Sequence, residues 1–236
     1  MKKKSAGKKR LWSERIGRAV LLGPMLLRMG PIERRKVLAD LELTSGDLRI
    51  GVDGGTDVWL KAGLPPHLAV GDWDSLRNRQ VLNAIPHLTY SPEKDESDLF
   101  LAARAAIDLG ARSIICAGVT GGRPDHQLAS IYDLSRIAAG QLGKVRAVST
   151  VGPEGTTHYL SGKIPSWKEK LRIGQTVSVL AVGGDAKGVS LQGFRHPLRN
   201  ASLACSSLGV SNLVKSPAVK VEIKRGSLIV FVPSPA

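Results

Sequence analysis

Short apolar runs alternate with segments of helical spacing over the first 150 residues, and this alternation restricts the fold more than any other feature of the sequence. Apolar runs separated by amphipathic helices are typical of βα units, which build a parallel sheet covered by helices. The expected strands are residues 18–22, 48–52, 67–70, 113–117 and 145–149. We therefore expect an α/β arrangement with a Rossmann-like parallel sheet in this part of the chain.

Two segments of this half carry clear helix signals. The first follows Asp95 and ends at Gly110, a residue type that often stands just after a helix. The second begins near Asp125 and stops at Gly140. An aspartate near each start is expected to cap the positive end of the helix. The residues expected to be buried are Leu99, Phe100, Ala103, Ala106 and Ile107 in the first helix, and Leu128, Ile131, Tyr132 and Ile137 in the second.

After about residue 160 the pattern changes to strict alternation of apolar and polar residues, punctuated by glycine and proline. This pattern is typical of antiparallel strands with one buried face. The expected strands are residues 176–182, 189–194 and 201–205, and the pair 219–224 and 228–232 around Arg225-Gly226. We expect residues 15–155 to form an α/β domain and residues 156–236 a small antiparallel β-sandwich domain.

The chain is strongly basic, with 34 Lys and Arg residues against 20 Asp and Glu and a net charge of +14. Such a charge raises the local concentration of anionic substrates, ATP as well as RNA. We interpret residues 1–14 as a basic, disordered tail. A secretory signal is not expected there, because Glu14, Arg15 and Arg18 precede the first apolar run.

The two cysteines, Cys116 and Cys205, lie far apart and outside any paired-ligand spacing. They therefore predict neither a disulfide framework nor a zinc site, and a reducing, cytoplasmic setting fits best. No apolar stretch approaches the roughly 20 residues that a membrane helix needs. We expect a cytoplasmic protein without a membrane-spanning segment.

Three loops that combine glycine with aspartate each follow an expected strand. They are residues 52–55 (VDGG), 71–75 (GDWDS) and 121–126 (GGRPDH), and residues 94–98 (KDESD) add a fourth acidic loop. Aspartate and glycine are common turn residues, which would explain any one loop alone. Ligands of open parallel sheets, however, bind beyond the carboxyl ends of the strands, where these loops should converge. Because glycine admits phosphate oxygens and Mg²⁺ prefers carboxylates, the loops predict one polyphosphate and magnesium site.

Single residues of these loops suggest roles in such a site. Asp72 and Asp74 alternate around Trp73, so both carboxylates can point the same way while the indole packs beneath them. Repulsion between the two carboxylates calls for a cation. Arg123 could clamp phosphate oxygens, although a surface arginine is the simpler interpretation. His126 fits capping or packing in the first turn of a helix as well as it fits a ligand contact.

The ordered motifs resemble those of the thiamine pyrophosphokinase family. The set is Asp53-Gly54-Gly55 and residues 71–75, 94–98, 122–126 and 209–212, and it covers most of the chain after Leu48. The resemblance implies transfer of the terminal two phosphates of ATP, as a unit, to the hydroxyethyl oxygen of thiamine. The products would be thiamine diphosphate and AMP, and Mg²⁺ would be required.

The resemblance also implies roles for particular residues. Asp72, Asp74 and Asp98 would hold the metal and orient the hydroxyl group. Residues implied at the nucleotide are Asp53, which also supports the metal ligands, with Gly54, Gly55, Lys94, Arg123, Asp125 and Gln127. Residues implied at thiamine are His196, Ser211 and Asn212. They would lie at a homodimer interface, where the β domain of one chain faces the α/β domain of the other.

Alternatives remain open at this point. His196 and Leu213 depart from the family pattern, which leaves a pterin alcohol as a possible acceptor. A basic nucleic-acid-binding protein is a second alternative, but the aromatic content of 4% and the lack of a recognised motif argue against it. A sensor that binds ATP without turnover is a third, disfavoured because a cluster of like charges is costly. The sequence has no P-loop and no nucleophile elbow.

Overall fold

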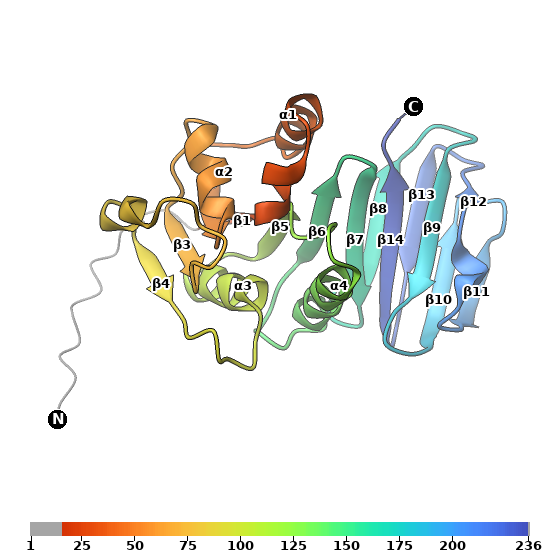
Figure 1. Ribbon diagram of the computed structural model, residues 1–236. Coiled ribbons are helices and arrows are strands. Elements are labelled where there is room, and N and C mark those ends of the chain that lie inside the picture. Colours follow the sequence, from red (N-terminus) through yellow and green to blue (C-terminus); the bar gives the residue numbers. More distant parts are fainter. Residues whose placement is uncertain (1–15, 236) are drawn as a thin grey trace.

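The computed structural model describes residues 16–235, and Figure 1 shows a helix-covered half followed by a half made of strands. The predicted basic tail, residues 1–14, lies outside the described residues. The helices are α1 (Pro31–Asp40), α2 (Gly55–Lys61), α3 (Asp98–Asp108) and α4 (Pro124–Ala138), with short 3₁₀ turns at η1 (Pro24–Arg28), η2 (Arg79–Asn83) and η3 (Ser207–Gly209). None of the helices in the described part is long and apolar enough to cross a membrane.

One ten-stranded sheet runs through both halves, in the order β12-β9-β14-β7-β6-β5-β1-β2-β3-β4. Its parallel part is β1 (Arg18–Leu22), β2 (Leu48–Val52), β3 (Leu68–Gly71), β4 (His87–Thr89), β5 (Ser113–Ala117) and β6 (Ala147–Gly152). Its antiparallel part is β7 (Gly155–Ser161), β9 (Thr176–Ala181), β12 (Asn212–Leu213) and β14 (Ser227–Pro233). The two parts meet at the tight β6–β7 connection, close to the predicted domain boundary. That boundary stays a prediction, because a single sheet crosses it.

A second sheet has four strands in the order β11-β10-β13-β8. They are β8 (Ser166–Lys170), β10 (Ala186–Gln192), β11 (Leu198–Leu203) and β13 (Ala218–Glu222). Its inward residues share one apolar core with the antiparallel end of the large sheet; Val189 and Val221 belong to this core together with Val179 and Val230. The expected mixture of a Rossmann-like parallel sheet and an antiparallel sandwich is confirmed.

Helices cover both faces of the parallel strands, with α1 and α2 on one side and α3 and α4 on the other (Figure 1). Along β1, Ala19 and Leu21 join the core under α3 and α4, whereas Val20 and Leu22 join the core under α1 and α2. A strand buried on both faces needs an unbroken apolar sequence, which explains the apolar runs of this half.

Some details differ from the sequence-based expectations. Helix α3 is capped by Ser97 and α4 begins after Arg123, so Asp95 lies before the cap of α3 and Asp125 lies within the first turn of α4. Leu128 and Tyr132 are 48% and 46% exposed, because α4 is buried mainly through its second half, from Asp133 to Ala138. Three expected strands are shifted by up to three residues: β6, β10 and β11.

The turn at Arg225-Gly226 does not join two paired strands. Strand β13 pairs with β8 and β10, whereas β14 pairs with β7 and β9, so this turn crosses from one layer of the sandwich to the other. Two alternating segments around a tight turn are the expected sequence pattern both for a hairpin of paired strands and for a turn that joins two layers. The pairing therefore depends on which sheet edge each strand meets.

Candidate active site

Three carboxylates meet at the carboxyl ends of the neighbouring strands β2 and β3. One oxygen each of Asp53, Asp72 and Asp74 lies within 4.8 Å of the other two. Asp53 directly follows β2 and Asp72 directly follows β3, so parallel pairing of these strands places the side chains side by side. Asp53 is buried, Asp72 is half-buried and Asp74 is exposed, which leaves the cluster open to solvent on one side.

Asp53 is held in place through one of its two oxygens. Its Oδ2 accepts hydrogen bonds from the backbone N–H of Ser75, at 3.0 Å, and from the Ser75 hydroxyl group. Its Oδ1 is buried and has no hydrogen-bond partner among residues 16–235. A buried oxygen without a partner is costly unless a cation or a donor completes it. The three carboxylates together therefore fit a hard cation such as Mg²⁺.

Trp73 separates the two outer carboxylates and is buried beneath them, as the sequence predicted. Its side chain is 5% exposed, and its Nε1–H donates to Thr89 Oγ1 at 2.9 Å. Its backbone φ of 69° lies in the left-handed region, which is uncommon for a bulky residue. Such strain is typical of functional turns. The buried ring keeps the loop in this conformation.

Lys94 links the carboxylate cluster to the start of α3. Its ammonium group is 2.7 Å from Asp72 Oδ2 and 3.2 Å from Asp98 Oδ1. Asp98 is the first residue of α3. The structure thus brings all three predicted metal ligands to one place, but the tightest trio contains Asp53, and Asp98 reaches it through Lys94. The metal-binding roles themselves stay predictions.

The local charges perturb the acids in opposite directions. Burial raises the pKa of Asp98 to about 6, and the charges of Asp72 and Asp53 add to this effect while Lys94 opposes it. The pKa of Asp74 is raised by the interaction of its carboxyl group with the neighbouring Asp53 carboxyl group and by partial burial. Burial alone would raise the pKa of Asp72, but hydrogen bonds from Lys94 and from the Asp74 backbone lower it overall.

The predicted nucleotide-binding glycines Gly54 and Gly55 lie in tight packing. The Gly54 N–H donates to Ser75 Oγ at 3.0 Å. A Cβ atom on Gly55 would lie 1.7 Å from the Leu22 carbonyl oxygen, so only glycine fits there. Close packing explains both glycines, and their contact with a nucleotide stays a prediction.

The predicted phosphate-binding residues lie at the start of α4. Arg123 pairs with Asp125 at 2.6 Å, and both side chains are largely exposed, as is Gln127. The loop before them follows β5 and emerges at the same edge of the sheet as the carboxylate loops, because β1, β2, β3 and β5 are all parallel. Arg123 is paired with Asp125 and not with the carboxylate cluster.

The predicted acceptor-binding residues form a separate group at the far edge of the ten-stranded sheet. Asn212 is buried; its Oδ1 accepts from the His196 N–H at 3.0 Å, and its amide donates to the His196 carbonyl oxygen at 2.9 Å. Ser211 has a φ of 57° and donates its N–H to Ser178. Seven strands lie between β12 and β3. The eight inter-strand spacings of about 4.8 Å add up to roughly 38 Å. Within one chain, this group does not meet the carboxylates.

Sequence reasoning missed two residues that support the carboxylates. Ser75 ties the Asp53 loop to the Asp72–Asp74 loop, and Asp57 accepts from the Arg77 N–H at 3.0 Å. Ser75 stands inside the 71–75 motif, so its place was a usable signal. Asp57 gave no signal, because its burial in α2 follows only from the packed structure.

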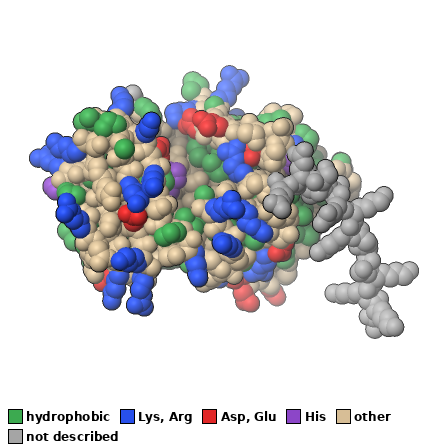
Figure 2. Space-filling model, turned by 180° about the vertical axis from the view of Figure 1, so that it is seen from behind, with side chains coloured by type: hydrophobic (Ala, Val, Ile, Leu, Met, Phe, Trp, Pro, Cys, Tyr) green, Lys and Arg blue, Asp and Glu red, His purple; other side chains and the backbone are tan. Residues whose placement is uncertain are grey.

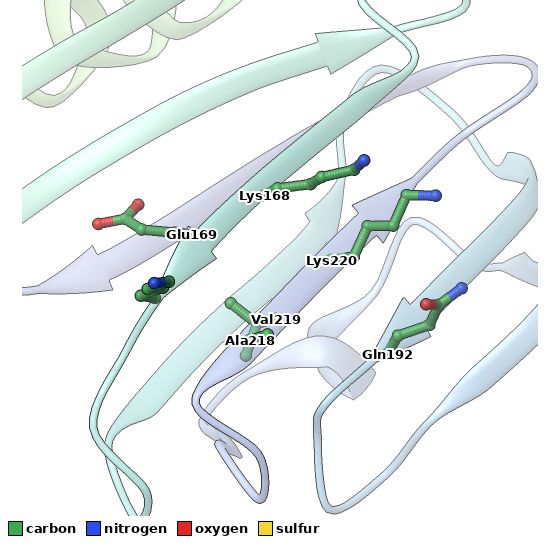
Figure 3. Close-up of a pocket in the computed structure, with 7 residues that line it drawn as sticks. Lys168, Glu169, Gln192, Ala218, Val219 and Lys220 are labelled. Carbon is green, nitrogen blue, oxygen red and sulfur yellow. The ribbon is translucent and has the colours of Figure 1, made fainter.

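A cavity of about 560 Å³ opens elsewhere, on the four-stranded sheet. Lys168, Lys220 and Gln192 are neighbours across three strands, and their side chains point the same way in Figure 3, while Glu169 points away. Lys220 pairs with Glu222 at 2.5 Å. This cavity carries part of the positive charge of the protein and does not contain the carboxylate site.

Comparisons with known proteins agree with this geometry. Residues 39–143 match the model of the thiamin pyrophosphokinase catalytic domain, and residues 166–228 match that of the thiamin pyrophosphokinase vitamin B1 binding domain. The chain is 31% identical over 189 residues to the thiamine pyrophosphokinase of Bacillus subtilis (strain 168), a match that covers 78% of this chain and 86% of the relative. The chain belongs to the thiamine pyrophosphokinase family.

Solved structures of the thiamine pyrophosphokinase family show the same fold. The crystal structure of the Bacillus subtilis protein superimposes with a TM-score of 0.75 and 25% identity, covering 93% of this chain and all of that one. The Geobacillus thermodenitrificans protein gives a TM-score of 0.74 and 24% identity, with 93% and 98% coverage. The Candida albicans protein, at 14% identity, still gives 0.70, over 93% of this chain and 89% of that chain. The overall fold is therefore shared with these proteins, even at 14% identity.

Proposed function

We propose that this protein transfers the terminal diphosphate of ATP to the hydroxyl oxygen of thiamine, giving thiamine diphosphate and AMP. Its family membership supports the reaction class. The observation that carries the proposal is the meeting of Asp53, Asp72 and Asp74 at the carboxyl ends of β2 and β3 in a chain of this family. Transfer of this kind needs alignment and charge neutralisation rather than a covalent nucleophile.

Asp72, Asp74 and Asp98 would hold Mg²⁺, with Asp53 supporting them from the neighbouring loop. Bound Mg²⁺ would supply neutralisation of the charge on the phosphate oxygens. Lys94 is held at the cluster by Asp72 and Asp98, so its ammonium group is in place to contact a phosphate. Ser75 fixes Asp53 and thereby keeps one buried oxygen directed at the cluster.

The nucleotide would lie between this cluster and the start of α4, in contact with Gly54, Gly55, Arg123, Asp125 and Gln127. The first turn of a helix favours bound anions, and Arg123 adds a planar cation there. Lys and Arg side chains spread over much of the face in Figure 2, while Asp and Glu form a few small groups. This positive surface would draw polyphosphates toward the protein.

Thiamine would be bound by Ser211, Asn212 and His196 of a second copy of the chain. The separation of roughly 38 Å within one chain supports this, because a single active site then needs the two groups from different protomers. A twofold dimer would form two equivalent sites of this kind. We therefore propose a homodimer as the active form.

A direct assay tests the reaction. The protein is incubated with ATP and Mg²⁺ and with thiamine or a pterin alcohol side by side, and the products are separated by chromatography. We expect AMP and thiamine diphosphate in equal amounts and no diphosphorylated pterin. Formation of product from the pterin alcohol alone would show that a pterin alcohol, and not thiamine, is the acceptor. Absence of AMP with both acceptors would reject the proposal.

Complementation tests the shared site. Asp72→Asn and Asn212→Ala chains are each expected to be inactive, because each lacks one half of every site. When the two chains are coexpressed, half of the dimers should be mixed and carry one intact site, which gives about a quarter of the wild-type activity. Failure of the mixture to recover any activity, with mixed dimers present, would contradict the shared site.

A cytoplasmic setting is also proposed. Both cysteines are free in the structure, Cys116 buried and Cys205 exposed, which suits a reducing compartment. Fractionation of cells that produce the protein, followed by immunodetection, tests this expectation.

A further inference from the structure

Four polar residues join the start of α3 to the second half of α4, and we call this group the α3–α4 clamp. The group consists of Glu96, Ser97, Asp133 and Arg136. The Ser97 hydroxyl donates to Asp133 Oδ2 at 2.5 Å, and Arg136 contacts Asp133 Oδ1 at 3.1 Å. Arg136 also holds Glu96 with two hydrogen bonds of 3.0 Å. Two helices far apart in sequence are thus fixed to each other by charge-assisted hydrogen bonds.

The geometry of the clamp leaves little freedom to its members. The guanidinium group of Arg136 lies 4.3 Å from the centre of the Phe100 ring, and its Nε donates to Gln141 at 2.8 Å. The Ser97 hydroxyl oxygen caps α3 by accepting from the Phe100 N–H at 3.1 Å. Asp133 fixes the direction of the Ser97 hydroxyl proton, so the cap has a single orientation.

The clamp lies next to the candidate active site in sequence and in space. Glu96 and Ser97 stand between Lys94 and Asp98, whose side chains meet at 3.2 Å beside Asp72. A shift of Glu96 and Ser97 would move both of these side chains, since no more than one residue separates either of them from the clamp. Apolar packing of α3 on β2 and β3 fixes the body of the helix, whereas the clamp fixes its first turn.

Stability alone does not account for such a group. The side chain of Asp133 is only 10% exposed, and taking a carboxylate out of water has a large cost. Apolar residues of similar volume often stabilise a protein as well or better than a buried ion pair. A defined position of the first turn of α3 is what the ionic arrangement adds.

We propose that Asp133 and Arg136 are positioning residues for Lys94 and Asp98, and through them for the divalent cation and the phosphates. This inference rests on the proposed function for its link to ATP. Substitution of residues that orient metal ligands through hydrogen bonds is expected to change metal affinity, although these residues do not contact the metal. Helix α4 would then contribute in two ways: its first turn would contact the phosphates, and Asp133 and Arg136 in its second half would position the metal ligands.

The test compares matched variants of two arginine–carboxylate pairs. Arg136→Lys keeps the charge but loses the paired hydrogen bonds to Glu96. Arg18→Lys makes the same change in the bidentate Arg18–Asp47 pair, which lies at the opposite end of the strands. Mn²⁺ serves as the probe, and its binding to the metal-free protein is followed by electron paramagnetic resonance in the absence of substrates. Melting temperatures are recorded for both variants.

We expect Arg136→Lys to raise the dissociation constant for Mn²⁺ by about tenfold and Arg18→Lys to leave it unchanged. Ser97→Ala should also weaken Mn²⁺ binding, and Ser97→Thr should restore it because threonine keeps the hydroxyl group. This pair gives a second reading if Arg136→Lys fails to fold. Wild-type affinity in Arg136→Lys or in Ser97→Ala would overturn the positioning role.

Diphosphate transfer is measured on the same samples, so that the two proposals fail separately. Weakened Mn²⁺ binding in Arg136→Lys, together with a wild-type protein that forms no thiamine diphosphate, would reject the proposed function and keep the clamp. Activity of the wild type together with unchanged Mn²⁺ affinity in the clamp variants would support the proposed function and reject the clamp proposal. A wild-type protein that binds no Mn²⁺ would overturn the clamp proposal.

Discussion

The two ends of the parallel strands carry acidic groups that are completed in different ways. At the amino ends, Asp47 is 3% exposed and accepts from Arg18 at 2.7 and 2.6 Å and from the Thr44 N–H at 2.7 Å. At the carboxyl ends, Lys94 contacts Asp72 and Asp98, while Asp53 and Asp74 have no ion pair within residues 16–235 and Asp53 Oδ1 has no hydrogen-bond partner there. The first group is balanced within the protein, and the second is not.

The difference separates stability from function. Burial alone would raise the pKa of Asp47, but the hydrogen bond from Arg18 lowers it overall, so this ionised group stabilises the fold. The pKa values of Asp74 and Asp98 are raised instead, so ionisation of these groups opposes folding. A protein that keeps such repulsion at one edge gains from it only when a cation binds.

The largest effect is expected from exchanging one carboxylate for an amide at each end. Asp72→Asn should lower kcat by about a thousandfold or more, because charge stabilisation is the main part of this chemistry. Its melting temperature should fall less than that of the matched variant at the amino ends, because loss of the ion pair with Lys94 is partly offset by relief of the repulsion among the acids. Steady-state kinetics and calorimetry measure the two effects.

Asp47→Asn is the matched control for this change. It should keep the wild-type kcat but lose about 2 kcal/mol of stability, because a buried pair with Arg18 is weakened. The contrast between the two ends would not hold if Asp72→Asn kept its activity, or if both variants lost stability equally.

Addition of Mg²⁺ should stabilise the protein only through the carboxylate cluster at the carboxyl ends of β2 and β3. A ligand that binds the folded state alone adds about 2.7 kcal/mol at a concentration one hundred times its dissociation constant. Thermal melting with and without Mg²⁺ measures this gain for wild type, Asp53→Asn and Asp47→Asn. We expect the gain to vanish in Asp53→Asn and to persist in Asp47→Asn; an equal gain in all three would place the cation elsewhere.

The convergence of the acidic loops could be predicted from sequence because topology determines it, although the expected trio held Asp98 in the place of Asp53. Once residues 48–52 and 67–70 are identified as parallel strands, Asp53 and Asp72 must emerge at one edge, wherever the rest of the chain goes. The buried Trp73 followed from the same alternation. The support from Ser75 could be found within the motif, but only the loop conformation gives it its contacts.

Other features depend on packing that a local pattern does not contain. Leu128 and Tyr132 have helical spacing with Ile137, yet they are exposed, because the first half of α4 has little structure beneath it. The turn at Arg225-Gly226 reads as a hairpin, although its strands lie in different sheets. The clamp partner Arg136 lies 40 residues from Glu96, so no local signal connects them.

The pH dependence of stability should have opposite sign at the two ends. Because burial raises the folded-state pKa of Asp98 to about 6, the folded state holds a proton between about pH 4 and 6 that the unfolded state releases. Stability from this group is therefore lost as the pH rises through that window, by on the order of 2 kcal/mol. For Asp47, whose pKa is lowered, stability is lost as the pH falls below the usual aspartate range.

Denaturant unfolding of metal-free protein at a series of pH values tests this sign. The difference in free energy of unfolding between wild type and Asp98→Asn should decline between pH 4 and 6. The corresponding difference between wild type and Asp47→Asn should increase as the pH rises from low values. A flat difference for Asp98→Asn would show that its carboxyl group is not perturbed. Excess Mg²⁺ should remove the decline, because the bound cation favours the ionised form.

The smallest effect is expected from Ser75→Ala, which leaves every charge in place. The Ser75 hydroxyl accepts from the Gly54 N–H and donates to Asp53, so its loss removes two hydrogen bonds between the loops after β2 and β3. We expect a loss of about 1 kcal/mol in stability and a weaker response to Mg²⁺, because Asp53 is less fixed. Ser130→Ala is the control, since within residues 16–235 the Ser130 hydroxyl group donates only to the Val119 carbonyl oxygen. If both variants respond to Mg²⁺ like wild type, the orientation of Asp53 comes from the backbone turn, whose φ at Asp53 is 47°, rather than from Ser75.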